Sequence, residues 1–184
     1  RAAHWAVVLQ VPAAFGSLAK VAEKVAAADL PEEMVAGLAA VCLHPLRKKL
    51  EGVRPVGAGE ALRRIVGRAL LSAEKAALAE GVGKHQLGAG LKGGGEKLAH
   101  VVRATAEARP LDCWVALDLS NAFGTMLRDG ALEAAVQVVP EYRAYLGTFL
   151  GRDTRYRFVR SGGTAVWMTA GEGAEQGGGW GPIL

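Results

Sequence analysis

The chain has 184 residues, of which 51% are apolar, and its formal net charge is +4. This length fits one domain or slightly more, and the apolar content excludes an intrinsically disordered chain. The charge suits a polyanionic partner without requiring one. Cys42 and Cys113 both lie in apolar surroundings, so we expect reduced core cysteines and no disulfide framework.

The N-terminal part predicts helices. Residues 1–40 are rich in alanine and fit two or three helices, with a break at Asp29 or Pro31. Residues 2–19 carry no Asp, Glu, Lys or Arg, but polar residues, a proline and a glycine interrupt the run. We therefore favour core helices over a membrane span. The chain begins with Arg1 and ends in the apolar run GWGPIL, so we expect a fragment of a longer protein.

A predicted hairpin comes next. Residues 41–59 predict two extended segments around a turn at residues 51–52, because Pro45 and Pro55 disfavour a helix.

Two further helices are predicted around a glycine-rich loop. From Glu60 the apolar residues recur at the spacing of one helix face, and Arg63, Arg64 and Arg68 are largely off that face. The loop GVGKHQLGAGLKGGG and a helix at residues 96–108 follow.

The remaining elements alternate between strands and helices. The segment CWVALD, residues 113–118, is a continuous apolar run and predicts a strand buried on both faces. A helix over residues 129–139 and a second helix opened by Pro140 follow. The segments TRYRFVR and TAVWMTA alternate well enough to predict a hairpin across residues 161–163.

Asp118 stands at the carboxyl end of the predicted strand, where a carboxylate loses hydration and needs a partner. One interpretation is a cap that accepts the backbone N–H of Ser120 or Asn121. The other includes Phe123, because polymerases place an aromatic residue five positions after such an aspartate. There the carboxylate holds a divalent ion against the triphosphate, and the ring leaves no room for a ribose 2′-hydroxyl.

Four stretches carry a resemblance to a known family. In chain order they read LHPLRKKLEGVRPVGAGEALRRIVGRAL, QLGAGLKGGGEKLAHVVR, DLSNAFGTMLRD and GAEQGGGWGPIL. Their order and spacing resemble those of reverse transcriptases of non-LTR retrotransposons, over roughly residues 30–184. The resemblance implies an α+β fold from a right-hand polymerase. Residues 1–110 would form a helix-rich, fingers-like region, and residues 111–184 a partial palm with an incomplete antiparallel sheet.

The resemblance also implies site residues and partners. Asp118 matches the first catalytic, metal-binding aspartate, and the Leu119 carbonyl would be a second ligand to the same Mg²⁺. Phe123 matches the aromatic residue that discriminates between sugars. The other implied nucleotide-binding residues are Arg54 on the triphosphate, Lys49 (with Lys48 as the alternative) beside it, and Gln176 and Gly177 near the template base. The implied partners are an RNA template, a DNA primer and deoxynucleoside triphosphates, in an intracellular protein of the nucleus or the cytoplasm.

The chain departs from the family pattern in two places. Gly178, Gly179 and Trp180 replace the Asp, Pro and Leu that usually follow the QG pair, and consecutive glycines are costly to order. The chain also contains no adjacent pair of aspartates, although two-metal phosphoryl transfer needs several carboxylates. The resemblance therefore implies that this chain alone does not polymerise nucleotides.

Two other functions remain open on the sequence. One is a non-catalytic nucleic-acid-binding remnant that keeps the basic residues between Arg47 and Arg68. The other is dinucleotide binding, because Gly88, Gly90 and Gly93 spell G-x-G-x-x-G before a predicted helix. That motif should follow directly from a buried strand, and AEGVGKHQL is too polar and glycine-rich for one.

Overall fold

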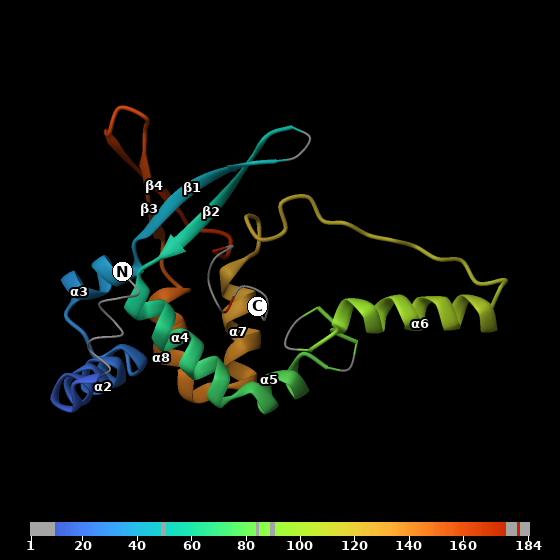
Figure 1. The fold of residues 1–184 in the computed structure, drawn as a ribbon, viewed down its shortest axis with the longest axis horizontal. Coiled ribbons are helices and arrows are strands. Elements are labelled where there is room, and N and C mark those ends of the chain that lie inside the picture. Colours follow the sequence, from blue (N-terminus) through green and yellow to red (C-terminus); the bar gives the residue numbers. More distant parts are fainter. Residues whose placement is uncertain (1–9, 49–50, 84, 89–90, 176–179, 181–184) are drawn as a thin grey trace.

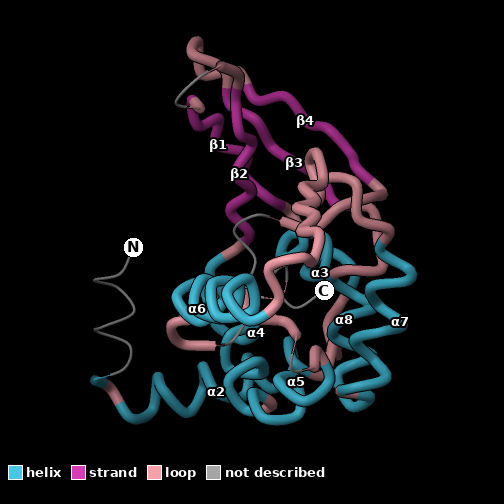
Figure 2. The backbone as a smooth tube through the Cα atoms, turned by 90° about the vertical axis from the view of Figure 1, so that its right-hand side faces the viewer, coloured by secondary structure: helices cyan, strands magenta, loops and turns pink. Residues whose placement is uncertain are grey.

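The protein is an α+β structure in which a four-stranded mixed sheet stands above a group of helices (Figures 1 and 2). The computed structural model describes residues 10–48, 51–83, 85–88, 91–175 and 180. In chain order the described elements are α2 (Pro12–Ala26), α3 (Glu32–Ala39), β1 (Val41–Arg47), β2 (Val53–Gly59), α4 (Ala61–Ala73), α5 (Lys75–Gly81), α6 (Gly94–Ala108), α7 (Arg128–Val138), the 3-10 turn η1 (Pro140–Tyr142), α8 (Arg143–Phe149), β3 (Thr154–Val159) and β4 (Ala165–Ala170).

The helices other than α6 surround the apolar core. Val25 of α2, Val66 of α4 and Leu146 of α8 are buried in one cluster, which also includes Val139 after α7. The Glu60 carboxylate caps the start of helix α4. It accepts a hydrogen bond of 2.6 Å from the backbone N–H of Leu62, which would otherwise be a free donor of the first helical turn. The helices predicted in residues 1–40, from Glu60, over residues 96–108 and 129–139, and after Pro140 are confirmed within the described residues. None of the described helices is both long enough and apolar enough to cross a membrane.

The sheet combines two antiparallel hairpins in the order β2-β1-β3-β4. Strands β1 and β2 pair from Val41 opposite Gly59 to Arg47 opposite Val53, next to the turn, and β3 and β4 pair over their full lengths. Gly52 and Gly163 take φ values of +93° and +81° in the two hairpin turns, a conformation that suits glycine. Both predicted hairpins are confirmed. They are joined by a parallel pairing of β1 with β3 at residues 41–43.

Side chains alternate between the two faces of the sheet. The core face carries the buried residues Val41, Gly57 and Thr154. The opposite face, called here the solvent face, carries exposed residues from all four strands. They are Cys42, His44 and Leu46 of β1, Arg54 of β2, Arg155, Arg157 and Val159 of β3, and Trp167 and Thr169 of β4.

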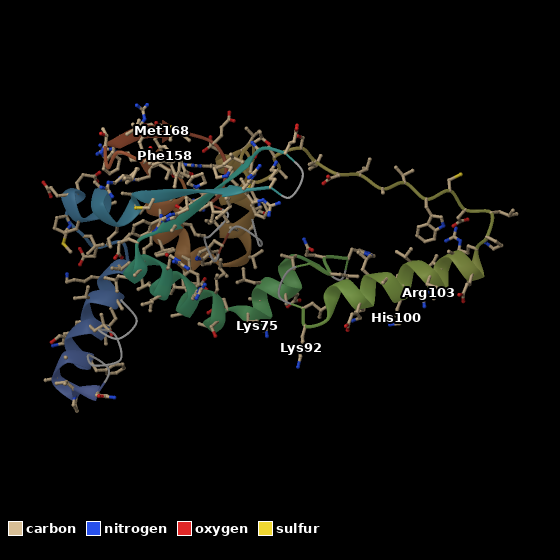
Figure 3. The ribbon with its side chains drawn as sticks, turned by 45° about the horizontal axis from the view of Figure 1, so that its top comes forward. Lys75, Lys92, His100, Arg103, Phe158 and Met168 are labelled. Atoms are coloured by element: carbon tan, nitrogen blue, oxygen red, sulfur yellow. The ribbon has the colours of Figure 1, made fainter. Side chains whose placement is uncertain are left out.

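Residues 113–118 do not form the predicted strand. The chain runs from the end of α6 as an extended segment, with Leu117 88% exposed, and crosses open space before it reaches α7 (Figures 1 and 3). A strand needs a neighbour for its backbone groups, and no described residue pairs with this segment. Helix α6 is equally isolated, since its apolar residues Leu98 and Val101 are exposed. The prediction was wrong because the local pattern specifies a strand but does not supply its partner.

The two cysteines do not lie in the core. Cys42 and Cys113 are free thiols, as predicted, but both are exposed. Cys42 is on the solvent face of β1, and Cys113 lies in the extended segment. Their apolar sequence neighbours were a poor guide, because alternate residues of a half-buried strand point to opposite faces.

We expect the core to account for stability and α6 to contribute little. Leu146 is 2% exposed and Leu98 of α6 is 51% exposed. Leu146→Ala should lower the free energy of unfolding by about 2–5 kcal/mol, because it removes buried methyl groups and leaves a cavity. Leu98→Ala removes the same atoms from an exposed position and should change the free energy by less than about 1 kcal/mol. Urea unfolding followed by circular dichroism measures both, and equal losses would contradict this description of the core.

Candidate functional site

A turn after the extended segment is joined to the segment that precedes Gln176. The backbone N–H of Ala174 donates to the carbonyl of Phe123 at 2.7 Å, and that of Gly173 donates to the carbonyl of Met126 at 2.8 Å. Gly173 has a φ of +81°, and a Cβ there would lie 2.7 Å from the carbonyl oxygen of Gly124. Glycine is therefore required at this close approach. The contact brings together two of the stretches that carry the family resemblance.

Arg128, the first residue of α7, also holds the segment that precedes Gln176. Its guanidinium is buried and donates to three backbone carbonyls: those of Gly173 at 2.8 Å, Glu172 at 2.9 Å and Arg152 at 2.5 Å. A guanidinium has five N–H donors and no acceptor, so carbonyl oxygens suit its burial. Arg128 thus holds the chain after β4 against the end of α8.

Arg63 of α4 and Glu175 form a buried ion pair at the centre of the site. Arg63 Nη2 lies 2.7 Å from Glu175 Oε1 and 2.8 Å from Oε2. The pair is possible because Gly59, at the end of β2, has no side chain. A Cβ at Gly59 would overlap the Arg63 guanidinium, and one at Gly57 would lie 3.8 Å from the Glu175 Cβ. The end of β2, the start of α4 and the segment before Gln176 therefore meet at one point.

The burial of Arg63 corrects the sequence analysis, which placed it largely off the buried face of its helix. Arg63 is 6% exposed, whereas Arg68 is exposed as expected. Its guanidinium also lies 5.7 Å from the centre of the Phe149 ring. The available signal was the run of small residues before α4, which leaves room for a large side chain. That signal could not identify the partner, which lies 112 positions away.

A small cavity adjoins this ion pair. It has a volume of about 80 Å³ and is lined by residues of α4, α8 and the segment at 173–175, together with Trp180. The Tyr145 hydroxyl donates to the Arg63 carbonyl at 3.2 Å beside it. Among the described residues, Arg64 Nε and Trp180 Nε1 are buried without a hydrogen-bond partner. We assign this cavity no ligand.

The predicted site residues fall into three groups. Asp118 and Leu119 lie exposed in the extended segment, and Phe123 lies in the turn joined to Ala174. Arg54 is exposed on the solvent face of β2, whereas Glu175 packs against Gly57 on the core face. The structure therefore brings Phe123 close to the segment before Gln176 but does not bring Arg54 to the same face. The predictions at Lys49, Gln176 and Gly177 lie outside the described residues.

The donor atoms of the predicted metal site belong to Asp118 and Leu119. Asp118 and the Leu119 carbonyl are hard oxygen donors of the kind that Mg²⁺ prefers. No hydrogen bond formed by the described residues reaches the Asp118 carboxylate, so the predicted cap on the backbone N–H of Ser120 or Asn121 is not formed. In the described part of the chain no three His, Cys, Asp or Glu side chains cluster as a metal site would require. The donors thus fit one weak site and not a pair of ions.

The glycine motif lies in the wrong context for a dinucleotide site. Gly88 follows the helix α5 rather than a strand, and Gly93 precedes α6 with a φ of +70°. A dinucleotide fingerprint needs a buried strand directly before its first glycine. Gly90 lies outside the described residues. The described context gives this alternative no support.

Comparison with known proteins adds no relative. No protein-family model, curated protein or solved structure matches the chain. The family resemblance consequently depends on the four sequence stretches and on the contacts among them.

We expect the buried ion pair to be sensitive to the loss of one partner. Arg63→Met or Glu175→Leu should lower the free energy of unfolding by about 3–5 kcal/mol, because each leaves an uncompensated buried charge. The double variant should recover much of that loss, since it buries no unpaired charge. The exposed pair of Lys24 with Asp29 is the control, and Asp29→Asn should barely shift the unfolding midpoint. Additive losses in the double variant would contradict the pairing.

We also expect stability to fall at alkaline pH. Burial raises the pKa of Tyr145 from its ordinary value of 10.0 to about 12. The folded state therefore retains the phenol proton more strongly than the unfolded state does. This contribution is complete below pH 10 and is lost as the pH rises from 10 to about 12. Urea unfolding between pH 9 and pH 11.5 should show a steeper decline for the native chain than for Tyr145→Phe, and parallel declines would contradict the raised pKa.

Proposed function

We propose that the chain is the fingers and part of the palm of an RNA-directed DNA polymerase. One observation carries the proposal. The turn of the stretch DLSNAF and the segment before the QG pair, about 50 residues apart in the sequence, are joined by two backbone hydrogen bonds. The buried pair of Arg63 with Glu175 adds the stretch that contains β2 and α4. Three of the four stretches that resemble the family thus meet in one place.

The proposed roles follow the chemistry of each side chain. Asp118 and the Leu119 carbonyl would hold Mg²⁺, which supplies charge neutralisation at the triphosphate when it is bound. Phe123 would pack on the sugar, and its backbone position is fixed by the hydrogen bond from Ala174. Lys49 would contact the phosphates, whereas Arg54, on the face of the sheet opposite Glu175, is left outside the proposed site. Gln176 and Gly177 would lie near the templating base.

A second candidate function is nucleic-acid binding without chemistry. It is favoured by the charge of the sheet, because none of the four strands contains Asp or Glu while each of β1, β2 and β3 contains arginine. The basic residues expected to form one surface are more dispersed than the sequence suggested, since Arg63 is buried. The two candidates differ in whether a longer chain that carries an aspartate pair polymerises nucleotides.

We expect no primer extension by residues 1–184. The chain offers Asp118 but no aspartate pair, so the second ion that activates the primer hydroxyl has no site. The assay is extension of a labelled DNA primer on an RNA template, with Mg²⁺ and all four deoxynucleotides. Fusion of a palm segment that carries an aspartate pair should give extension, and Asp118→Asn should abolish it. Extension by the unfused chain, or extension that survives Asp118→Asn, would contradict the roles assigned here.

Phe123 provides a separate readout in the fused chain. Phe123→Ala should increase the use of ribonucleotides relative to deoxynucleotides, because a small residue leaves room for the 2′-hydroxyl. Phe149→Ala is unsuitable as a control because that ring is buried in the core. Phe15→Ala, at an exposed ring on α2, is the matched control and should leave the ratio unchanged.

A further inference from the structure

The solvent face of the sheet groups two arginines with an exposed tryptophan. Arg157 of β3 is directly opposite Trp167 of β4, and Arg155 is two positions earlier on the same face. The Arg155 guanidinium carbon lies 4.7 Å from the centre of the Trp167 ring. This is the diagonal contact expected across an antiparallel pair. Phe158 and Met168, the chain neighbours of Arg157 and Trp167, lie on the opposite face because side chains alternate along a strand.

Trp167 is 48% exposed in spite of this contact. A cation over one side of an indole orients the ring and leaves its other side free to stack. Arg157 remains exposed and makes no ion pair with any described residue. The contact between Arg155 and Trp167 therefore explains the orientation of the ring but not the second arginine beside it.

Further basic residues lie on the same face but farther away. Cys42 is the β1 residue opposite Arg157, whereas His44 of β1 and Arg54 of β2 lie past the three residues over which β1 pairs with β3. The acidic residues that flank β3 and β4 lie just outside these two strands, at Asp153 before β3 and Glu172 after β4. Asp153 is at the base of the second hairpin, where its carboxylate is close to Gly171. A negatively charged ligand thus meets no carboxylate on the strands themselves.

We propose that this face, with Trp167, Arg155 and Arg157 at its centre, binds single-stranded nucleic acid. An unpaired base stacks on the free side of the Trp167 indole, and the two guanidinium groups contact the flanking phosphates. A duplex is the poorer ligand, because its bases are already stacked and cannot reach the indole. The inference rests on the proposed function only in that the chain handles nucleic acid. It requires neither Asp118 nor Mg²⁺.

The test is fluorescence anisotropy of a labelled 12-nucleotide RNA and of the matching DNA, at two salt concentrations, without Mg²⁺ or nucleotides. Trp167→Leu should weaken binding between about fivefold and about a hundredfold. The salt dependence should not change, because stacking releases no counterions. Trp114→Leu is the matched control, since Trp114 is 52% exposed but lies in the extended segment. Equal effects of the two substitutions would overturn the proposal.

A double variant tests the contribution of Arg155 and Arg157, and a second double variant is its control. The double variant Arg155→Gln/Arg157→Gln should weaken binding and reduce the slope of log affinity against log salt by about 1.4, at about 0.7 for each phosphate contact. Lys92→Gln/Arg103→Gln removes the same charge beside and within α6, away from the sheet (Figure 3), and should leave the slope nearly unchanged. Circular dichroism of each variant establishes that it is folded.

Three results would overturn the inference. They are equal slopes for the two double variants, binding of a blunt duplex as tight as that of the single strand, and binding to anionic vesicles without binding to either oligonucleotide. Because the measurement omits metal and nucleotides, its failure leaves the polymerase roles untouched. Failure of primer extension in the fused chain would likewise not affect the proposal that this face binds single-stranded nucleic acid. Comparison of the RNA with the DNA shows whether the face distinguishes the sugar.

Discussion

The buried ion pair between Arg63 and Glu175 is the constraint on which the arrangement of the site depends. It connects α4 to the segment after β4 across 112 positions of sequence. It also requires a glycine at residue 59, because any side chain there would occupy the space of the guanidinium. Arg128 supports the same segment from its other side with three hydrogen bonds to carbonyls. Two buried arginines, Arg63 and Arg128, therefore fix the position of residues 172–175.

Such an arrangement is stable only if both charges remain fully satisfied. A buried ion pair gains little net energy over an apolar pair, and its value lies in the geometry it imposes. Arg63 reaches both carboxylate oxygens of Glu175, and Arg128 uses carbonyl oxygens that would otherwise be unpaired. Gly59 makes this close packing possible, because a Cβ there would overlap the Arg63 guanidinium.

Local sequence patterns were sufficient for most helices and for both hairpins. Periodicity identified α4, and prolines with a turn glycine identified the β1–β2 hairpin. The same reasoning failed where the answer depends on a distant partner. The parallel pairing of β1 with β3 leaves no local signal, and neither does the burial of Arg63. Residues 113–118 have the composition of a strand, but hydrogen bonding to a neighbour decides whether a strand forms.

Of the site itself, the order of the motifs indicated that Phe123 and the segment before Gln176 belong together. It did not indicate that Arg54 faces away from Glu175, which follows from the hairpin register.

The exposed extended segment gives Asp118 a second physical role. Residues 113–119 combine strand-forming apolar side chains with unpaired backbone groups, the combination that promotes intermolecular sheet formation. Asp118 carries the only charge in that run, and stacking copies in register would place like charges opposite one another. The carboxylate is thus a gatekeeper against aggregation. An Asp118→Asn protein loses that repulsion as well as the proposed metal ligand, so a decline in its soluble yield has a cause separate from any change in metal binding. Asp118→Glu keeps the charge and separates the two effects.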